Sequence, residues 1–217
     1  CKEWVSQGIQ VTVITCAPNF PKGKVFDGYK NRLRQVEYID GIKVVRVWTY
    51  ISANEGFLKR ILDYLSFSFS GFMVGLSIRT DVIIATSPQF FTALSGRWLS
   101  FFKRKPWIME VRDLWPESIV AVGAMKKGRI IRFFEWLERR LYTSANHIIV
   151  VTDTFKRNII DKGVNPTKIS VHKNGANLGI YKPQVKDQKL LKELGLEGKI
   201  IFAYIGTLGM AHGLDFI

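Results

Sequence analysis

The chain has 217 residues, of which 47% are hydrophobic and 23% are charged, and this ordinary globular composition excludes a disordered chain, a collagen-like fibre and a low-complexity linker. Lys and Arg total 32 against 18 Asp and Glu, so the formal net charge is +14 and an anionic partner is expected. The two cysteines, Cys1 and Cys16, are too few for a disulfide framework or a four-cysteine zinc site.

The first elements of the chain predict the start of an α/β fold. Residues 1–7 resemble the last turn of a helix, and the alternating, β-branched run 9–16 predicts a strand. Asp40-Gly41 then separates two further alternating runs, at residues 35–39 and 42–48. Asp-Gly between such runs favours a β-hairpin with a two-residue turn.

Residues 57–78 form the most hydrophobic stretch, and from Ile61 to Ile78 the only charge is Asp63. The length is close to the ~18 apolar residues of a membrane-spanning helix. The aspartate, four serines and two glycines argue against a spanning helix. The favoured interpretation is a long helix packed on a sheet, and the alternative is a helix that also enters a membrane interface.

The middle of the chain alternates strands with helices. Strands are expected at residues 81–86, 107–111, 147–151 and 168–172, and helices at residues 90–102, 128–142 and 153–162. Short continuous apolar runs are typical of parallel strands that are buried on both faces. The alternation predicts a doubly wound, Rossmann-like parallel sheet. The buried face of helix 128–142 is expected to consist of Ile130, Phe133, Phe134, Leu137 and Leu141.

A domain boundary is predicted near Pro183, where the chain becomes polar and its charge becomes balanced. Residues 199–205 then predict a new strand, which a glycine-rich loop follows. We therefore assign residues 1–182 to an N-terminal Rossmann-like domain and residues 183–217 to the start of a second one.

Polar side chains follow the predicted strand 107–111, and ligands of open α/β sheets bind at the carboxyl ends of the strands. Asp113 and Glu117 suit sugar hydroxyls or proton transfer, and Arg112 suits an anion. The alternative is a loop closed by an ion pair from Arg112 to Asp113 or to Glu117, without a ligand.

Two further strand ends carry candidate residues. After strand 168–172, Asn174-Gly175 suits a left-handed turn. After strand 199–205, a loop offers backbone amides to phosphate oxygens, although its spacing is neither the dinucleotide nor the P-loop pattern. The alternative for both segments is a plain turn. The loop residues are Gly206, Thr207, Gly209 and His212.

Several common motifs are absent from the sequence. It contains no G-x-S-x-G, no H-E-x-x-H, no RNA-binding aromatic motif and no helix-turn-helix. The three histidines, His147, His172 and His212, do not have the spacing of metal ligands. Neither a metal site nor a nucleic-acid partner is expected.

Three motifs together resemble the GT-B glycosyltransferases of family 4: D-L-W-P-E-S at residues 113–118, K-N-G-A-N at residues 173–177 and G-T-L-G-M-A-H-G at residues 206–213. The resemblance covers essentially the whole chain. It is greatest for the bacterial O-antigen, capsule and exopolysaccharide subgroup, which includes fucosaminyltransferase-like enzymes. It implies two Rossmann-like domains across a cleft, with the acceptor on the first domain and a nucleotide-sugar on the second.

The resemblance also implies roles for single residues. Asp113 would lie near the reacting sugar with Arg112 and Glu117 beside it, and Asn174-Gly175 would lie at the domain junction. The donor diphosphate would contact the loop that contains Gly206, Thr207, Gly209 and His212. Thr207 and His212 stand where many relatives carry Arg and Lys.

The activity expected from the resemblance is retaining sugar transfer from a nucleotide-sugar to a lipid-linked glycan in surface polysaccharide biosynthesis, without a metal or another cofactor. The expected location is the cytoplasm, at the inner face of the plasma membrane, where a basic domain contacts anionic lipid. The family's first strand and its Glu-x7-Glu segment would lie before Cys1 and after Ile217, so the 217-residue chain alone is expected to be inactive.

Three other interpretations stay open. A GT-B-like sugar-nucleotide epimerase has the same fold and would convert the donor without an acceptor. A non-enzymatic basic module would bind nucleic acid in a salt-dependent manner, although the basic residues lack interleaved aromatic ones. A membrane-interface protein would be anchored by residues 57–78, and this interpretation is compatible with the transferase.

Overall fold

The computed structural model describes residues 1–52, 57–87, 90–121, 123 and 128–206. The strands are β1 (Thr12–Cys16), β2 (Arg34–Ile39), β3 (Ile42–Val47), β4 (Ile83–Thr86), β5 (Trp107–Val111), β6 (His147–Val150) and β7 (Ile169–Val171). The helices are α1 (Lys2–Ser6), α2 (Phe57–Leu76), α3 (Phe90–Lys103), α4 (Glu117–Ala121), α5 (Arg129–Ser144), α6 (Asp153–Asp161) and α7 (Gln188–Glu193), with a 3₁₀ turn at Pro166–Lys168. Alternating strands and helices confirm the expected α/β, Rossmann-like fold class.

The strands form two sheets rather than the one sheet that the sequence predicts. The first has the order β1-β3-β2, in which β1 is parallel and β2 antiparallel to β3. The hairpin turn is confirmed, because Asp40 and Gly41 have φ of 50° and 77°, as a two-residue turn requires. The second sheet has the order β4-β5-β6-β7 and is entirely parallel. No strand of the described part joins β1 to β4, so the two sheets have separate hydrogen-bond ladders.

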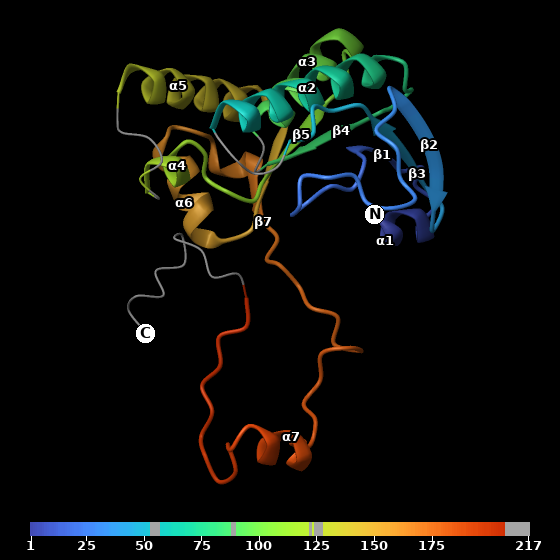
Figure 1. Ribbon diagram of the computed structural model, residues 1–217. Helices are drawn as coiled ribbons and strands as arrows, with labels where there is room; N and C mark the ends of the chain where they lie inside the picture. Colours follow the sequence, from blue (N-terminus) through green and yellow to red (C-terminus); the bar gives the residue numbers. More distant parts are fainter. Residues whose placement is uncertain (53–56, 88–89, 122, 124–127, 207–217) are drawn as a thin grey trace.

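The hydrophobic core lies between the parallel sheet and its helices. Trp107, Met109 and Val111 alternate along β5 and are buried, and Ile148 and Val150 continue this buried face on β6. Helices α2, α3 and α5 form a layer over one side of the sheets (Figure 1). The loops at the carboxyl ends of the parallel strands are not part of this helix layer. These loops carry the candidate residues.

Helix α5 buries a different face from the predicted one. Phe134, Leu137 and Leu141 contact the core as expected, but Ile130 and Phe133 are exposed. The side chains that take their place are Ile131, Glu138 and Tyr142, which are all buried. A charged residue is tolerated in this face because α6 supplies a cation, as described below.

Helix α2 runs beside α3 across the top of the molecule (Figure 1). In the part of the chain that the structure describes, no helix is long and apolar enough to cross a membrane. Helix α2 packs against α3, β1 and β3, as the favoured interpretation of residues 57–78 predicts.

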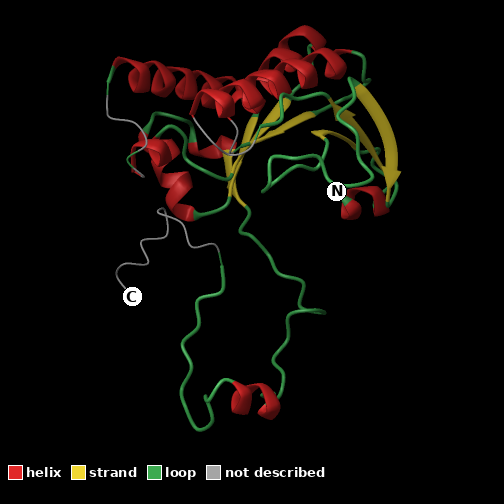
Figure 2. Cartoon of the chain, viewed as in Figure 1, coloured by secondary structure: helices red, strands yellow, loops and turns green. Residues whose placement is uncertain are grey.

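After β7 the chain leaves the body, forms α7 at a distance from the sheets and turns back (Figure 2). The strand expected at residues 199–205 is not formed. A strand needs a hydrogen-bonded neighbour, and none of the described residues pairs with this segment. The domain boundary near Pro183 falls within this extended stretch and stays a prediction.

Candidate functional site

The candidate site lies at the carboxyl edge of the parallel sheet, where β4 and β5 end side by side and β7 ends one strand further along, beyond β6. The loop after β4 is fixed to the loop after β5: the Arg112 N–H donates to Ser87 Oγ at 3.0 Å, and the Ser87 N–H donates to the Glu110 carbonyl at 2.8 Å. The Thr86 hydroxyl donates to Glu110 Oε2 at 2.7 Å. These bonds set the position at which Arg112 leaves the sheet.

Two of the predicted segments meet at this edge. Arg112 Nη2 donates to Asn174 Oδ1 at 3.4 Å, although 62 residues separate them in the chain. The next cation, Lys173, pairs with Asp153 on α6 at 3.1 Å, and both side chains are well exposed. Arg112 and Lys173 therefore place positive charge where the loops after β5 and β7 approach each other.

The segment D-L-W-P-E-S is anchored by its second half. The ring of Trp115 lies 4.6 Å from Phe90 and 4.7 Å from Phe134, centroid to centroid, and Pro116 is fully buried. Aromatic contacts of this kind contribute ~1 kcal/mol each beyond the area they bury. The loop is therefore held by α3 and α5 while Arg112 and Asp113 stay at the sheet edge.

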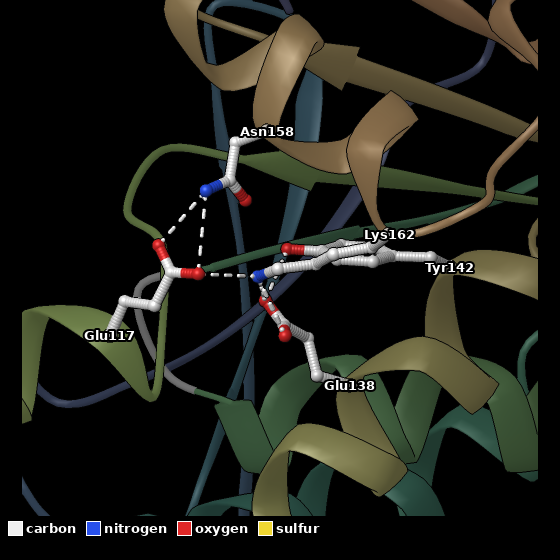
Figure 3. Close-up of polar contacts among 5 residues, drawn as sticks. All are labelled: Glu117, Glu138, Tyr142, Asn158 and Lys162. Atoms are coloured by element: carbon white, nitrogen blue, oxygen red, sulfur yellow. Dashed lines mark hydrogen bonds and ion pairs between the residues drawn. The ribbon is translucent and has the colours of Figure 1, made fainter.

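Glu117 is held by a polar network rather than by Arg112 (Figure 3). Lys162 Nζ lies 3.0 Å from Glu117 Oε1 and 2.9 Å from Glu138 Oε2. Asn158 Nδ2 donates to Glu117 Oε2 at 3.0 Å, and the Tyr142 hydroxyl donates to Glu138 Oε1 at 2.8 Å. Lys162 thus joins α4, α5 and α6 through two carboxylates, and the Arg112–Glu117 ion pair of the alternative interpretation is not formed.

Burial sets the protonation behaviour of this network. The Glu138 side chain is only 1% exposed, and its burial raises its pKa above the usual value, which the charge of Lys162 partly offsets. Burial raises the pKa of Tyr142 far above its usual range, and the charge of Glu138 adds to this effect. Tyr142 is therefore a permanent hydrogen-bond donor to Glu138.

Asp113 differs from its neighbours, because its carboxylate has no hydrogen bond or ion pair within the described residues. It is half-buried at the edge of the sheet, one residue after Arg112. The predicted Arg112–Asp113 ion pair is therefore not formed. An unpaired, half-buried carboxylate is available to bind a hydroxyl group or to accept a proton from one.

The structure describes only some of the other predicted site residues, which lie after β7. Gly175 is exposed, but it does not have the left-handed conformation expected for Asn-Gly. The turn occurs at residues 178–180 instead, where Asn177 Oδ1 accepts from the Gly179 N–H at 2.9 Å. Gly206 is exposed at the end of the extended stretch. Three predicted donor-loop residues lie outside the described part: Thr207, Gly209 and His212.

Sequence reasoning missed Ser87, Asn158 and Lys162. Ser87 follows a predicted strand end, so its position was available as a signal. Asn158 lies within α6, and Lys162 directly follows its last residue. Nothing in the sequence around these two residues indicates that α4 packs beside them.

The chain is thus a Rossmann-like α/β domain with polar groups at the carboxyl edge of its parallel sheet, the edge at which proteins of this fold bind ligands. The family model for the glycosyl transferase 4-like domain matches residues 1–175. The chain belongs to this family. The matched residues include all the strands of the part that the structure describes, the loop after β5 and the loop after β7 as far as Gly175.

Two curated relatives extend the comparison. The chain is 25% identical over 225 residues to the putative colanic acid biosynthesis glycosyl transferase WcaI of Escherichia coli K12, covering 98% of this chain and 54% of the relative. It is 22% identical over 156 residues to the probable glycosyltransferase WbjE of Pseudomonas aeruginosa, covering 71% of this chain and 39% of the relative. The chain therefore spans about half the length, or less, of the relatives it matches.

Proposed function

We propose that the protein carrying this chain is a retaining glycosyltransferase of bacterial surface polysaccharide biosynthesis, which moves a sugar from a nucleotide-sugar to a lipid-linked glycan. The observation that carries the proposal is the unpaired Asp113 carboxylate beside Arg112 in a chain of the glycosyl transferase 4-like family. The names of the curated relatives, one of them a colanic acid biosynthesis enzyme, support the polysaccharide context.

The proposed roles follow from which side chains are already engaged. Asp113 binds the acceptor hydroxyl near the reacting sugar, because its carboxylate has no competing partner within the described residues. Arg112 supplies positive charge to the donor, and Asn174 orients it through the bond between their side chains. Glu117 is a positioning residue, since Lys162 and Asn158 occupy both of its oxygens.

The donor diphosphate is proposed to be bound by the loop from Gly206 to His212 and by basic side chains, without a metal ion. Backbone amides and guanidinium groups stabilise a leaving diphosphate in the way that a metal ion does elsewhere. The test is transfer in the presence of a chelator, which is expected to leave the rate unchanged. A rate that falls with chelation and returns with a divalent cation would overturn this part.

Contact with the cytoplasmic face of the plasma membrane is proposed for the same protein. The support is the charge excess of +14, since anionic lipid attracts basic surfaces by ~1 kcal/mol per Lys or Arg near the bilayer. A lipid-linked acceptor would also be reached most readily from that surface.

The central experiment uses the full-length protein with a panel of nucleotide-sugars and a lipid-linked acceptor, with the anomer of the product read by NMR. Asp113→Asn is expected to lower kcat by about 10²–10⁴-fold with an unchanged melting temperature, because it removes only the free carboxylate. The matched control is Asp161→Asn, at an exposed position on α6, which is expected to retain full activity. Full activity of Asp113→Asn would contradict the assignment.

The epimerase alternative is separated by the same assay. Conversion or hydrolysis of the nucleotide-sugar without any acceptor, and with no transfer when an acceptor is present, would favour it over the transferase.

A further inference from the structure

Helices α2 and α3 expose apolar side chains on the side that faces away from the sheets. On α2 these side chains recur every three or four residues, so they share one face of the helix. The exposed apolar residues of the two helices, here called the outer face, are Leu62, Leu65, Phe69, Met73, Leu76, Trp98, Phe101 and Phe102. Single exposed apolar residues are ordinary, but a continuous group on two adjacent helices marks an interaction surface.

The outer face is continuous across the two helices. The ring of Phe102 on α3 lies 5.8 Å from Phe72 on α2, and it also contacts Trp98 and Phe101 at 6.2 Å and 5.5 Å. The exposed fractions of Phe101 and Phe69 are 69% and 67%. These rings are therefore displayed to the surroundings as one aromatic surface rather than folded against the body.

The inner face of α2 differs from the outer face, because serines and glycines lie on it among the apolar side chains. Ser68 Oγ and Ser95 Oγ lie 2.6 Å apart between α2 and α3, and the Ser66 hydroxyl accepts from the Tyr50 N–H at 2.8 Å. Gly75 is buried against Leu99, where a Cβ would lie 2.7 Å from a methyl carbon. Small residues on this side let α2 and α3 lie close together, while the large apolar side chains of α2 remain on the outer face.

The exposed charges on the helices of this layer are of one sign. The basic residues exposed on α2 and α5 are Lys59, Arg60, Arg129, Arg132, Arg139 and Arg140. Among the side chains described on α2, α3 and α5, none of the exposed ones is acidic: Asp63 and Glu135 are half-buried, and Glu138 is buried. Such a surface matches anionic lipid headgroups, whereas a protein partner would need an acidic surface of matching shape.

Helix α5 extends this surface in the same layer, since the rings of Phe90 on α3 and Phe134 on α5 lie 5.9 Å apart. Its exposed side combines Phe133 and Trp136, whose rings stack, with Arg140, whose guanidinium lies 5.4 Å from the centroid of the Trp136 ring. Tryptophan beside arginine is typical of the interfacial zone of a bilayer, where the ring is partly buried and the cation reaches phosphate.

We infer that the outer face of α2 and α3, with the basic side of α5, lies in the interfacial zone of an anionic phospholipid bilayer. The inference assigns the membrane contact proposed above to these helices. It rests on that proposal only for the identity of the partner, a lipid bilayer. It makes the helix layer, rather than the sheet edge that carries Asp113, the surface that touches lipid.

The test is cosedimentation of the full-length protein with vesicles of phosphatidylcholine that contain about one third phosphatidylglycerol, compared with phosphatidylcholine alone. The triple variant Phe69→Ser, Trp98→Ser and Phe101→Ser is expected to bind at least about a hundredfold more weakly, since one interfacial aromatic ring contributes about tenfold. Replacing Arg132 and Arg139 by Gln is expected to weaken binding about fivefold for each charge removed.

The matched control replaces two equally exposed apolar residues outside this layer, Leu33→Ser and Tyr38→Ser, whose exposed fractions are 81% and 71%. It is expected to bind like the wild type. Equal binding by the triple variant and the wild type, equal binding to neutral vesicles, or no vesicle binding at all would overturn the inference. A dimer in light scattering that the triple variant dissociates, without vesicle binding, would assign the face to a second copy of the chain instead.

Vesicle binding and sugar transfer are separate readouts. Loss of lipid binding in a variant that still transfers sugar to a soluble acceptor analogue would support this inference and the transferase together. Lipid binding by a protein that transfers no sugar would leave this inference standing while the proposed function fails.

Discussion

Lys162 is the residue on which the polar network beneath the candidate site depends. It lies between Glu138, which is buried, and Glu117, which is partly exposed, and its own side chain is 14% exposed. Two carboxylates would otherwise approach each other in a poorly hydrated region, which is unfavourable. The network therefore links α5 to α4 and α6 only while the cation is present, whereas Asn158 joins α6 to α4 without it.

Replacing this cation should be costly. Lys162→Met is expected to lower the free energy of unfolding by ~3–5 kcal/mol, because it leaves the Glu138 charge buried without its partner. The measurement is urea unfolding at neutral pH. Lys105→Met is the control: its ion pair with Asp81 is at the surface, and a change below ~1 kcal/mol is expected. Similar losses for the two variants would show that Glu138 is better hydrated than its burial indicates.

Glu138 also gives the protein a pH dependence with a definite sign. Because burial raises the pKa of Glu138, the folded state binds the proton more tightly than the unfolded chain does. The contribution of this group to stability is therefore complete below its usual pKa of 4.5 and is lost as the pH rises through the folded-state value. Glu138→Gln cannot titrate, so its stability relative to the wild type is expected to increase as the pH rises above 4.5.

Urea unfolding of both proteins at a series of pH values measures this difference. Titrating groups that are distant from Glu138 cancel in the comparison, since the two chains differ only at residue 138. A difference that does not change with pH would show that the pKa of Glu138 is not raised.

At the scale of elements, the contact between α3 and β4 is set by one glycine. A Cβ on Gly96 would lie 2.5 Å from the Cβ of Ala85 on β4, and neither atom can move without its backbone. Gly96→Ala is expected to destabilise the fold by ~1–2 kcal/mol, although alanine favours a helix over glycine by ~1 kcal/mol.

Gly71→Ala in α2 is the matched control. The nearest atom to its new Cβ would be Ile14 Cγ2 at 3.8 Å, which is an ordinary contact, so a gain of up to ~1 kcal/mol is expected. Urea unfolding of both variants gives the comparison. Stabilisation by Gly96→Ala would mean that α3 can move away from the sheet.

The elements themselves could be predicted because each depends on neighbours in the chain. The apolar run of β6, the Asp40-Gly41 turn and the Thr152 cap, whose Oγ1 accepts from the Phe155 N–H at 3.1 Å, are all local signals. The buried face of α5 was predicted incorrectly at Ile130 and Phe133, since burial of Glu138 requires Lys162 from another helix. Polarity along one helix cannot reveal a partner that lies 24 residues away.

The position of the candidate site could be predicted from the sequence, but the pairing of its carboxylates could not. The carboxyl-edge rule identified Arg112, Asp113 and Asn174, and the structure brings Arg112 and Asn174 into contact. Which carboxylate is engaged and which is unpaired was not predictable, because Asp113 and Glu117 are chemically alike in the sequence. Only the packing of α4 against α6 distinguishes them.

At the scale of the whole molecule, the body and the stretch after β7 differ in how they are held. From His172 to Gly206 nearly every residue is exposed, and α7 has no buried residue. Trypsin is therefore expected to cleave first at Lys186, well before sites within the body, because cleavage requires several residues of unprotected backbone; the bond after Lys182 resists trypsin because Pro183 follows it.

The N-terminal product of that digestion tests the predicted boundary near Pro183. It is expected to keep the melting temperature of the uncut chain to within a few degrees, since the core between the parallel sheet and its helices ends with β7. Mass spectrometry identifies the cleavage sites, and circular dichroism of the purified product gives the melting temperature. A product that unfolds far below the uncut chain would place residues beyond 186 in the same cooperative unit, because only residues that share a core with the body can change its melting temperature by that much.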